Sequence, residues 1–333
     1  MGASQHQHYV PRLLLKGFLS RDSEEAKKEQ VRVFDLIEQR SFPTSIDNIM
    51  GEHRFNEWWL DEKTMATIEP AVGRIESHLA PLIRRIRRER RLERTPEVFH
   101  DLALLMALQY IRTKRMRLLP KRLDDQFRVD VKKRGFNPDK VQGLVDWDEK
   151  TLKKQHVKHQ IDGLAKCTGL IAEKKFFLMT APEGSSFYLG DHPVALYKDE
   201  DDRGVIGDLD LEDPYIQIYL PLSADMMLCA YGPVVLDDLM KNRDEQMAEV
   251  KGTALKHLMD GRVSAAQMKE MMERAKASHI TTQVIGAICT GEPWAAERKQ
   301  VQLYNLLQAS YAHRFVVDPD GKFEVARETI TKH

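Results

Sequence analysis

The sequence has few cysteines, no long apolar run and no net charge, and each shortage excludes a class of protein. The three cysteines (Cys167, Cys229 and Cys289) are odd in number and lack paired spacing, so neither a disulfide framework nor a cysteine-based zinc site is expected. No apolar stretch approaches the roughly 18 residues that a membrane helix needs. The start of the chain lacks the apolar middle of a signal peptide. We therefore expect a cytoplasmic protein with no membrane partner.

Common catalytic motifs are also missing. The sequence contains no Walker loop, no GxGxxG motif after a strand, no GxSxG elbow and no kinase signature. These absences argue against a nucleotide-driven motor, a dehydrogenase and a serine hydrolase. A hydrophobic fraction of 42% and a charged fraction of 31% are typical of a globular protein. We expect one domain over residues 1–333, with a weak division near residue 150 as the alternative.

The order of periodic segments predicts an α+β fold. Thr95 and Pro96 form a good helix start, and Pro70, Pro81 and Pro120 should start, kink or end helices. Helices are expected over 57–91, 98–119, 121–134, 149–174, 233–256, 264–277 and 295–311. Strands are expected over 31–35, 176–180, 186–190, 194–197, 215–222 and 226–231, with a hairpin over 314–325. This order places helix-rich N-terminal and C-terminal parts around a mainly antiparallel central sheet.

Charge is unevenly distributed along the chain. Residues 84–94 hold seven arginines against two glutamates, and residues 112–134 hold ten basic groups against three acidic ones. Residues 199–213 reverse the balance, with eight acidic groups and one arginine. The two basic stretches predict a nucleic-acid partner, or else simply a solvated helix surface. Nothing in the sequence identifies a protein partner.

Polar residues interrupt the apolar faces of two predicted helices. Glu69 and Glu76 open a stripe that continues with Val72, Leu79, Ile83 and Ile86. In the next helix, Gln109 and Arg112 share a face with Leu102, Leu105 and Met116. A buried arginine keeps its charge, so Arg112 should have a carboxylate partner among Glu69, Glu76 and Asp191. The pattern fits either a structural ion pair or a phosphate clamp.

Several other polar residues occupy informative positions. Asp191 and His192 precede Pro193 between two predicted strands, where either a catalytic group or an ordinary turn is expected. His6 and His8 should lie on one face of an extended segment. His156 and His159 are surrounded by lysines, so we expect them on a solvated surface. Asn305 and Gln308 are expected to bond to the backbone or to line a polar pocket.

Seven segments resemble a known family. They are HQHYVPRLLLKGF (6–18), VRVFD (31–35), IEPAVGRIE (68–76), LQYIRT (108–113), FYLGDHPV (187–194), IYLPLS (218–223) and YNLLQASYAHRFVV (304–317). Together they resemble the HYVP-motif family, domain of unknown function 4238, over nearly the whole chain. The family pattern usually reads Ser-Asp-Asn-Pro where this chain has Gly190, Asp191, His192 and Pro193. The resemblance implies no established activity, and it suggests phage defence or stress as a setting.

These residues lead to two functional hypotheses. The first is a metal-assisted nucleic-acid phosphodiesterase with His8, Glu69, Glu76, Arg112 and Asp191 as catalytic residues. In it, His8, Glu76 and Asp191 would bind a divalent metal, and the stretches 84–94 and 112–134 would guide the nucleic acid. The alternative is a non-catalytic protein- or RNA-binding module in which the same residues form a buried ion-pair network.

Overall fold

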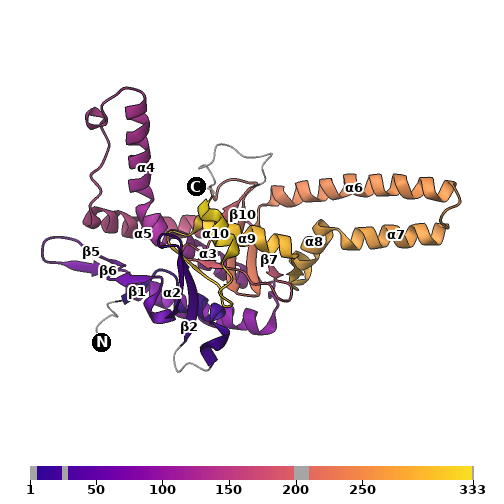
Figure 1. The fold of residues 1–333 in the computed structure, drawn as a ribbon, viewed down its shortest axis with the longest axis horizontal. Helices are drawn as coiled ribbons and strands as arrows, with labels where there is room; N and C mark the ends of the chain where they lie inside the picture. The colour runs from indigo at the N-terminus through magenta and orange to yellow at the C-terminus, as the bar shows by residue number, and fades with distance from the viewer. Residues whose placement is uncertain (1–5, 25–28, 199–209, 332–333) are drawn as a thin grey trace.

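A five-stranded sheet from the middle of the chain forms the centre of the protein (Figure 1). The computed structural model describes residues 6–24, 29–198 and 210–331, so most of the acidic stretch 199–213 lies outside the described residues. The strands lie in the order β12-β7-β11-β10-β9, and all pair antiparallel except β12 with β7. Their bounds are β7 (Lys175–Thr180), β9 (Ala195–Tyr197), β10 (Gln217–Ser223), β11 (Met226–Tyr231) and β12 (Trp294–Ala295). Both faces of this sheet are covered, because every residue of β10 and β11 is buried.

A second sheet brings together strands that are far apart in the sequence. Its order is β3 (Arg40–Ser45), β2 (Gln30–Asp35), β13 (Phe315–Val317) and β8 (Leu189–Gly190). The hairpin predicted over 314–325 is therefore wrong, because β13 pairs with β2 and β8 instead. Asp318 accepts hydrogen bonds from the amides of Asp320 and Lys322, and this turn leads into a helix rather than a strand.

Two short hairpins complete the strands. β1 (His6–His8) pairs with β4 (Gly51–His53), and β5 (Glu57–Trp59) pairs with β6 (Met65–Thr67). The helix predicted from residue 57 is thus wrong for its first part. Asp61 accepts the amides of Lys63 and Thr64, each at 2.8 Å, and this local turn competes with a helix.

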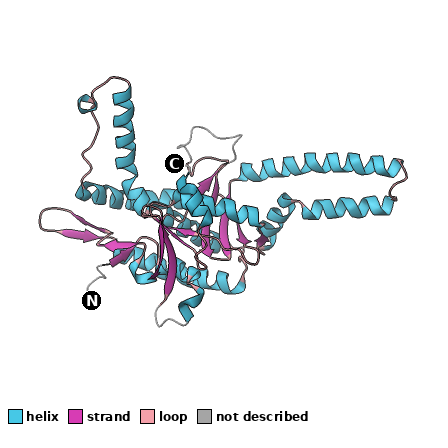
Figure 2. Cartoon of the chain, viewed as in Figure 1, coloured by secondary structure: helices cyan, strands magenta, loops and turns pink. Residues whose placement is uncertain are grey.

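Long helices precede and follow the strands of the five-stranded sheet in the sequence, and these strands pair mainly antiparallel, so the predicted α+β class is confirmed (Figure 2). The first five are α1 (Arg12–Leu15), α2 (Glu69–Glu89), α3 (Pro96–Ile111), α4 (Lys114–Lys133) and α5 (Glu149–Ala172). The others are α6 (Pro233–Met259), α7 (Ala265–Ser278), α8 (Ile280–Thr290), α9 (Arg298–Tyr311) and α10 (Glu324–Thr331). No helix in the described ranges combines the length and apolar character needed to span a membrane.

Helices α2 and α3 follow their sequence signals closely at the N-terminal end. Pro70 lies in the first turn of α2, whereas Pro81 lies inside α2 without ending it. The side chain of Thr95 caps α3 by accepting the amide of Val98. The apolar face of α2 is buried, as its period predicts.

The long helix predicted through residue 119 is interrupted. Ile111 ends α3 and Lys114 begins α4, so Arg112 and Thr113 separate the two helices. No glycine or proline marks this break, and Thr113 adopts an extended backbone with φ −80° and ψ 164°. Pro120, expected to kink or end a helix, lies inside α4. The contacts that fix the break come from residues far away in the sequence.

Two parts of the molecule extend away from the central sheets (Figure 1). One is α4 with the segment that returns from it to α5, and the other is the pair α6 and α7. Within the body, one large apolar cluster contains residues from both sides of position 150, including Leu105 and Leu228. The division considered near residue 150 therefore passes through a shared core.

Candidate functional site

A buried arginine joins the N-terminal strand to two helices. Arg112, directly after α3, is 1% exposed, and its guanidinium donates to the carboxylate of Glu76 on α2. It also donates to the backbone carbonyl of His8 on β1. Glu76 is thus the carboxylate partner that a buried arginine should have. Both terminal nitrogens of Arg112 are engaged in holding β1, α2 and α3 together.

Glu69 is linked to the same strand through two amide side chains. Asn56 donates to Glu69 at 2.7 Å, and the Asn56 backbone amide donates to the side chain of Gln7 at 2.6 Å. Gln7 also donates to Glu57 at 3.1 Å. Glu69 therefore fixes the loop between β4 and β5 against the start of α2.

The ring of His8 is half-buried and neutral. Its Nδ1 lies 3.1 Å from the carbonyl oxygen of Ile49, and a carbonyl oxygen can only accept, so Nδ1 carries the hydrogen. Burial lowers the pKa of His8, and the neighbouring His6 lowers it further. The two rings pack edge to face with centroids 5.1 Å apart, as the spacing of two predicts.

Asp191 is fully buried and binds the backbone after α9. Its carboxylate accepts the amides of His313 at 2.6 Å, Arg314 at 3.0 Å and Phe315 at 3.2 Å. Burial raises the pKa of Asp191 to about 6, and these three hydrogen bonds oppose the rise. Of the two roles considered for Asp191, this geometry fits the structural one. The adjacent Gly190 has no room for a side chain, because an added Cβ would lie 2.8 Å from a backbone oxygen.

The residues predicted to bind a metal are not arranged for it. Among the described residues, no group of three His, Cys, Asp or Glu side chains is placed to hold a metal ion. Glu76 is bonded to the cationic Arg112, and both oxygens of Asp191 are occupied by backbone amides. His8, Glu76 and Asp191 therefore do not fit a shared divalent-metal site in this conformation.

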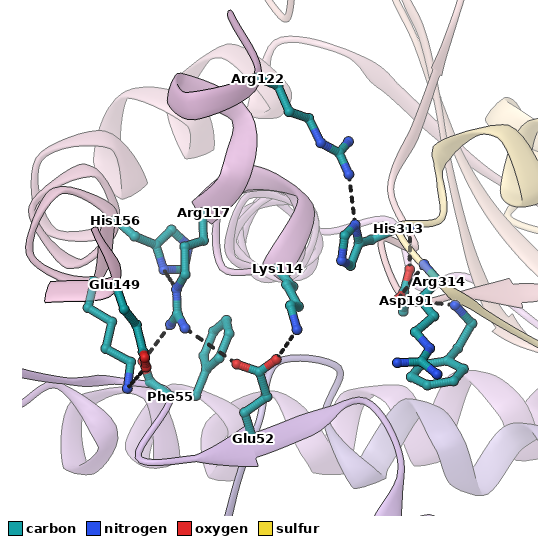
Figure 3. A network of polar contacts seen from close by, with 12 residues as sticks. Glu52, Phe55, Lys114, Arg117, Arg122, Glu149, His156, Asp191, His313 and Arg314 are labelled. Carbon is teal, nitrogen blue, oxygen red and sulfur yellow. Dashed lines mark hydrogen bonds and ion pairs between the residues drawn. The ribbon is translucent and has the colours of Figure 1, made fainter. Parts of the chain in front are cut away.

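A second polar network fixes the first turns of α4 (Figure 3). Glu52 on β4 accepts from Lys114 and lies 3.6 Å from a guanidinium nitrogen of Arg117. The guanidinium carbon of Arg117 lies 3.5 Å from the centre of the Phe55 ring, and Arg117 also donates to the Phe55 carbonyl at 2.5 Å. Burial lowers the pKa of Arg117 to about 10, so the side chain remains charged at neutral pH.

His156 belongs to this network, which corrects the expectation of a solvated surface. It is 3% exposed, and its Nε2 donates to the Ile111 carbonyl at 3.0 Å. Its Nδ1 accepts from Arg117 at 3.4 Å. Burial and the Arg117 charge lower the pKa of His156 to about 3. The surrounding lysines hide this position in the sequence, because they occupy the other faces of α5.

Arg122 connects α4 to the segment after α9 (Figure 3). Its guanidinium donates to Nδ1 of His313 at 2.8 Å. Burial, together with the charges of Arg122 and Lys114, lowers the pKa of His313 to about 4. His313 is the residue whose amide binds Asp191, so the two networks meet at this segment.

The break between α3 and α4 is held by a buried histidine. Thr113 Oγ1 lies 2.5 Å from Nδ1 of His192, and the ring of His192 stacks on Tyr311 with centroids 5.9 Å apart. Burial lowers the pKa of His192 to about 3. On α9, Asn305 and Gln308 each bond to backbone groups between residues 186 and 193, as expected.

Most arginines of the basic stretch 84–94 are engaged by other groups of the protein, although five of the seven are exposed. Arg87 donates to the carbonyls of Leu13 at 2.8 Å and Leu222 at 2.7 Å. Arg94 donates to the carbonyl of Cys289 at 2.8 Å at the end of α8. Arg85, Arg90 and Arg91 each form an ion pair with a carboxylate. This stretch therefore presents far less free positive charge than its composition indicates.

The basic stretch 112–134 has a different arrangement. Helix α4 carries eight basic and three acidic residues, an excess of five positive charges. Its exposed basic side chains, with that of its C-cap, are Arg122, Lys132, Lys133 and Arg134, which we call the α4 surface. Lys132 and Arg134 form no ion pair with the described residues, and Lys133 lies 3.8 Å from Asp130.

Two pockets lie elsewhere, where α2 ends and α3 begins, and the second also borders the end of α8. Their volumes are about 400 and 710 Å³, and they share Leu82, Arg85 and Glu93 as lining residues. Arg85 and Glu93 pair at 2.7 Å. The smaller pocket is also lined by Glu97 and Asp101, and the larger one by Arg91 and Arg94. None of the five predicted catalytic residues lines either pocket.

Comparison with known proteins identifies the family. A sequence model of the family described as protein of unknown function (DUF4238) matches residues 6–322. The chain belongs to DUF4238. Searches of curated proteins and of solved structures gave no match. In this DUF4238 protein, the HYVP segment therefore has a visible structural role, because the His8 carbonyl binds Arg112 and β1 pairs with β4.

Proposed function

We propose that this DUF4238 protein binds nucleic acid through the α4 surface, and that its buried polar residues hold that surface in position. The observation that carries the proposal is the group of exposed basic side chains, Lys132, Lys133 and Arg134, at the far end of a helix that extends from the body. Basic side chains that approach phosphates release bound counterions, and this supplies most of the sequence-independent affinity for nucleic acid. The whole chain has a net charge of zero, so attraction to phosphates must come from a local group of positive charges such as this one.

The internal networks support a positioning role. Arg117 and Lys114 bind Glu52 at the base of α4, and Arg122 reaches His313. These contacts tie α4 to β4 and to the segment that follows α9. A helix anchored at one end and free at the other can present charges without deforming the core.

Binding has more support than hydrolysis. A hydrolase needs acidic or basic groups that converge on an accessible cleft. Here Glu76 is paired with Arg112, and Asp191 is fully buried and accepts three backbone amides. We therefore favour the non-catalytic binding module over the metal-assisted phosphodiesterase.

The test is fluorescence anisotropy with labelled oligonucleotides at about 50 mM and about 200 mM salt. The variant Lys132→Ala/Lys133→Ala/Arg134→Ala should bind more weakly, and the slope of log K against log salt should fall by about two. The matched control is Arg74→Ala/Arg84→Ala/Arg88→Ala, which removes the same charge from exposed positions on α2. We expect the control to retain its affinity within about twofold.

Two results would overturn the proposal. Equal losses in the two triple variants would mean that total charge, not the α4 surface, sets the affinity. Cutting of the labelled strand in Mg²⁺ or Mn²⁺, lost in both His8→Ala and Asp191→Ala while circular dichroism shows that both variants are folded, would restore the phosphodiesterase hypothesis. Both results can be read from the same samples by anisotropy and by gel.

A further inference from the structure

Helix α4 carries an apolar stripe on its solvent side. Leu119, Leu123 and Phe127 repeat every four residues and are 37%, 60% and 49% exposed. Just beyond the helix, Phe136 is 69% exposed, and its amide donates to the Val131 carbonyl at 3.1 Å. At about 1.5 Å per residue, the stretch from 119 to 131 is roughly 18 Å long.

This stripe is unusual for a helix of a globular protein. An amphipathic helix normally turns its apolar face toward the core. In α4 the one buried side chain is Arg117, while the apolar side chains of the stripe face outward. Groups of exposed apolar side chains on a globular protein often mark a binding site.

Charge identifies the class of partner. The α4 surface places Lys132, Lys133 and Arg134 at the same end of the helix as Phe127 and Phe136. A partner for this end must therefore offer negative charge and flat apolar groups together. Nucleic acid offers both when its bases are unpaired, because each base then presents an open π-face beside a phosphate.

We propose that Phe127 and Phe136 stack on the bases of single-stranded nucleic acid whose phosphates contact the α4 surface. This inference rests on the proposed function and adds the form of the nucleic acid. A duplex keeps its base faces stacked inside the helix, so an exposed phenylalanine gains little from it. Stacking is tolerant of sequence, so the preference should be for strand state and not for a particular base.

The experiment compares labelled oligo(dT), oligo(U) and a DNA duplex, each of about 20 nucleotides, at one fixed salt concentration. In full-length protein, Phe127→Ala/Phe136→Ala should weaken binding to both single strands about tenfold or more and leave duplex binding unchanged. The control is Ile161→Ala on α5, which shortens another apolar side chain that is 59% exposed. Ile161→Ala should bind all three ligands like the unmodified protein.

The outcomes separate this inference from the proposed function. Unchanged single-strand binding in the phenylalanine variant, with the lysine and arginine triple variant still defective, would overturn the stacking proposal alone. Failure of the unmodified protein to bind any of the three ligands would overturn both. Concentration-dependent self-association in sedimentation, lost in the phenylalanine variant, would instead assign the stripe to a second copy of the chain and overturn the stacking proposal.

Discussion

Removing Glu76 should show how much the ion pair with the buried Arg112 contributes to the stability of the protein. Breaking a buried ion pair by deleting one partner costs about 3–5 kcal/mol, because the remaining charge has no compensation. Glu76 itself has a side chain that is 32% exposed, so water can reach part of the site. We therefore expect Glu76→Ala to lower the free energy of unfolding by about 2–3 kcal/mol. Urea unfolding followed by circular dichroism at pH 7 measures this loss.

A double-mutant cycle separates the pair from the rest of the site. The cycle consists of Arg112→Met, Glu76→Leu and Arg112→Met/Glu76→Leu. In the double variant no charge is left without a partner, so its loss should fall short of the sum of the two single losses by at least about 1.5 kcal/mol. The matched control is Glu69→Ala on the same face of α2, where the carboxylate accepts from the neutral Asn56. That variant should lose about 1 kcal/mol, the usual contribution of one hydrogen bond. Additive losses, or a loss below about 0.5 kcal/mol for Glu76→Ala, would refute the reasoning.

Three further outcomes can be measured by the same unfolding assay. Arg87→Ala should cost about 2–3 kcal/mol because it leaves carbonyls unpaired, whereas the exposed Arg88→Ala should change stability by less than about 0.5 kcal/mol. Gly291→Ala should cost at least about 2 kcal/mol of stability, because φ is +77° and the new Cβ would lie 2.0 Å from the Leu92 carbonyl oxygen. As its control, Gly252→Ala on α6 should raise stability by about 0.5–1 kcal/mol, because the new Cβ meets nothing within 4 Å. Burial raises the pKa of Asp191 to about 6, so its contribution is full below about pH 4 and is lost as pH rises through 6. The stability advantage of the unmodified protein over Asp191→Asn should thus shrink by up to about 2–3 kcal/mol between pH 4 and pH 7.

Local signals in the sequence predicted the class of fold and most of its elements. The helix cap at Thr95 and the series of short apolar strands after residue 175 are signals of this local kind, and both are confirmed. The break after Ile111 could not be predicted in this way. It depends on Arg112 reaching β1 and α2 and on Thr113 reaching His192, which is 79 residues away. Contacts between residues so far apart in the chain produce no periodic pattern in a single sequence.

Only part of the candidate site could be predicted from the sequence. A polar residue on an apolar face correctly indicated Arg112, because a buried charge requires a partner. Glu76 could not be chosen over Glu69 in this way, since both lie on one face of α2. The pair of Arg122 and His313 was missed because neither residue interrupts an apolar pattern, and 191 positions separate them. The buried His156 was missed because its neighbours in the sequence are lysines.

The two basic stretches show why composition alone misjudges a binding surface. Residues 84–94 have the higher density of arginine, yet Arg87 and Arg94 are engaged with backbone carbonyls of their own chain. Arg87 is held by the start of the chain and by β10, so its charge is removed from the surface. In α4 the charges divide by position along the helix: Arg117 near the start is buried, whereas Lys132 at the end is exposed. The start of α4 is therefore bound to the protein and its end is available for a partner. Because of this division along one helix, we propose residues 112–134, and not 84–94, as the nucleic-acid surface.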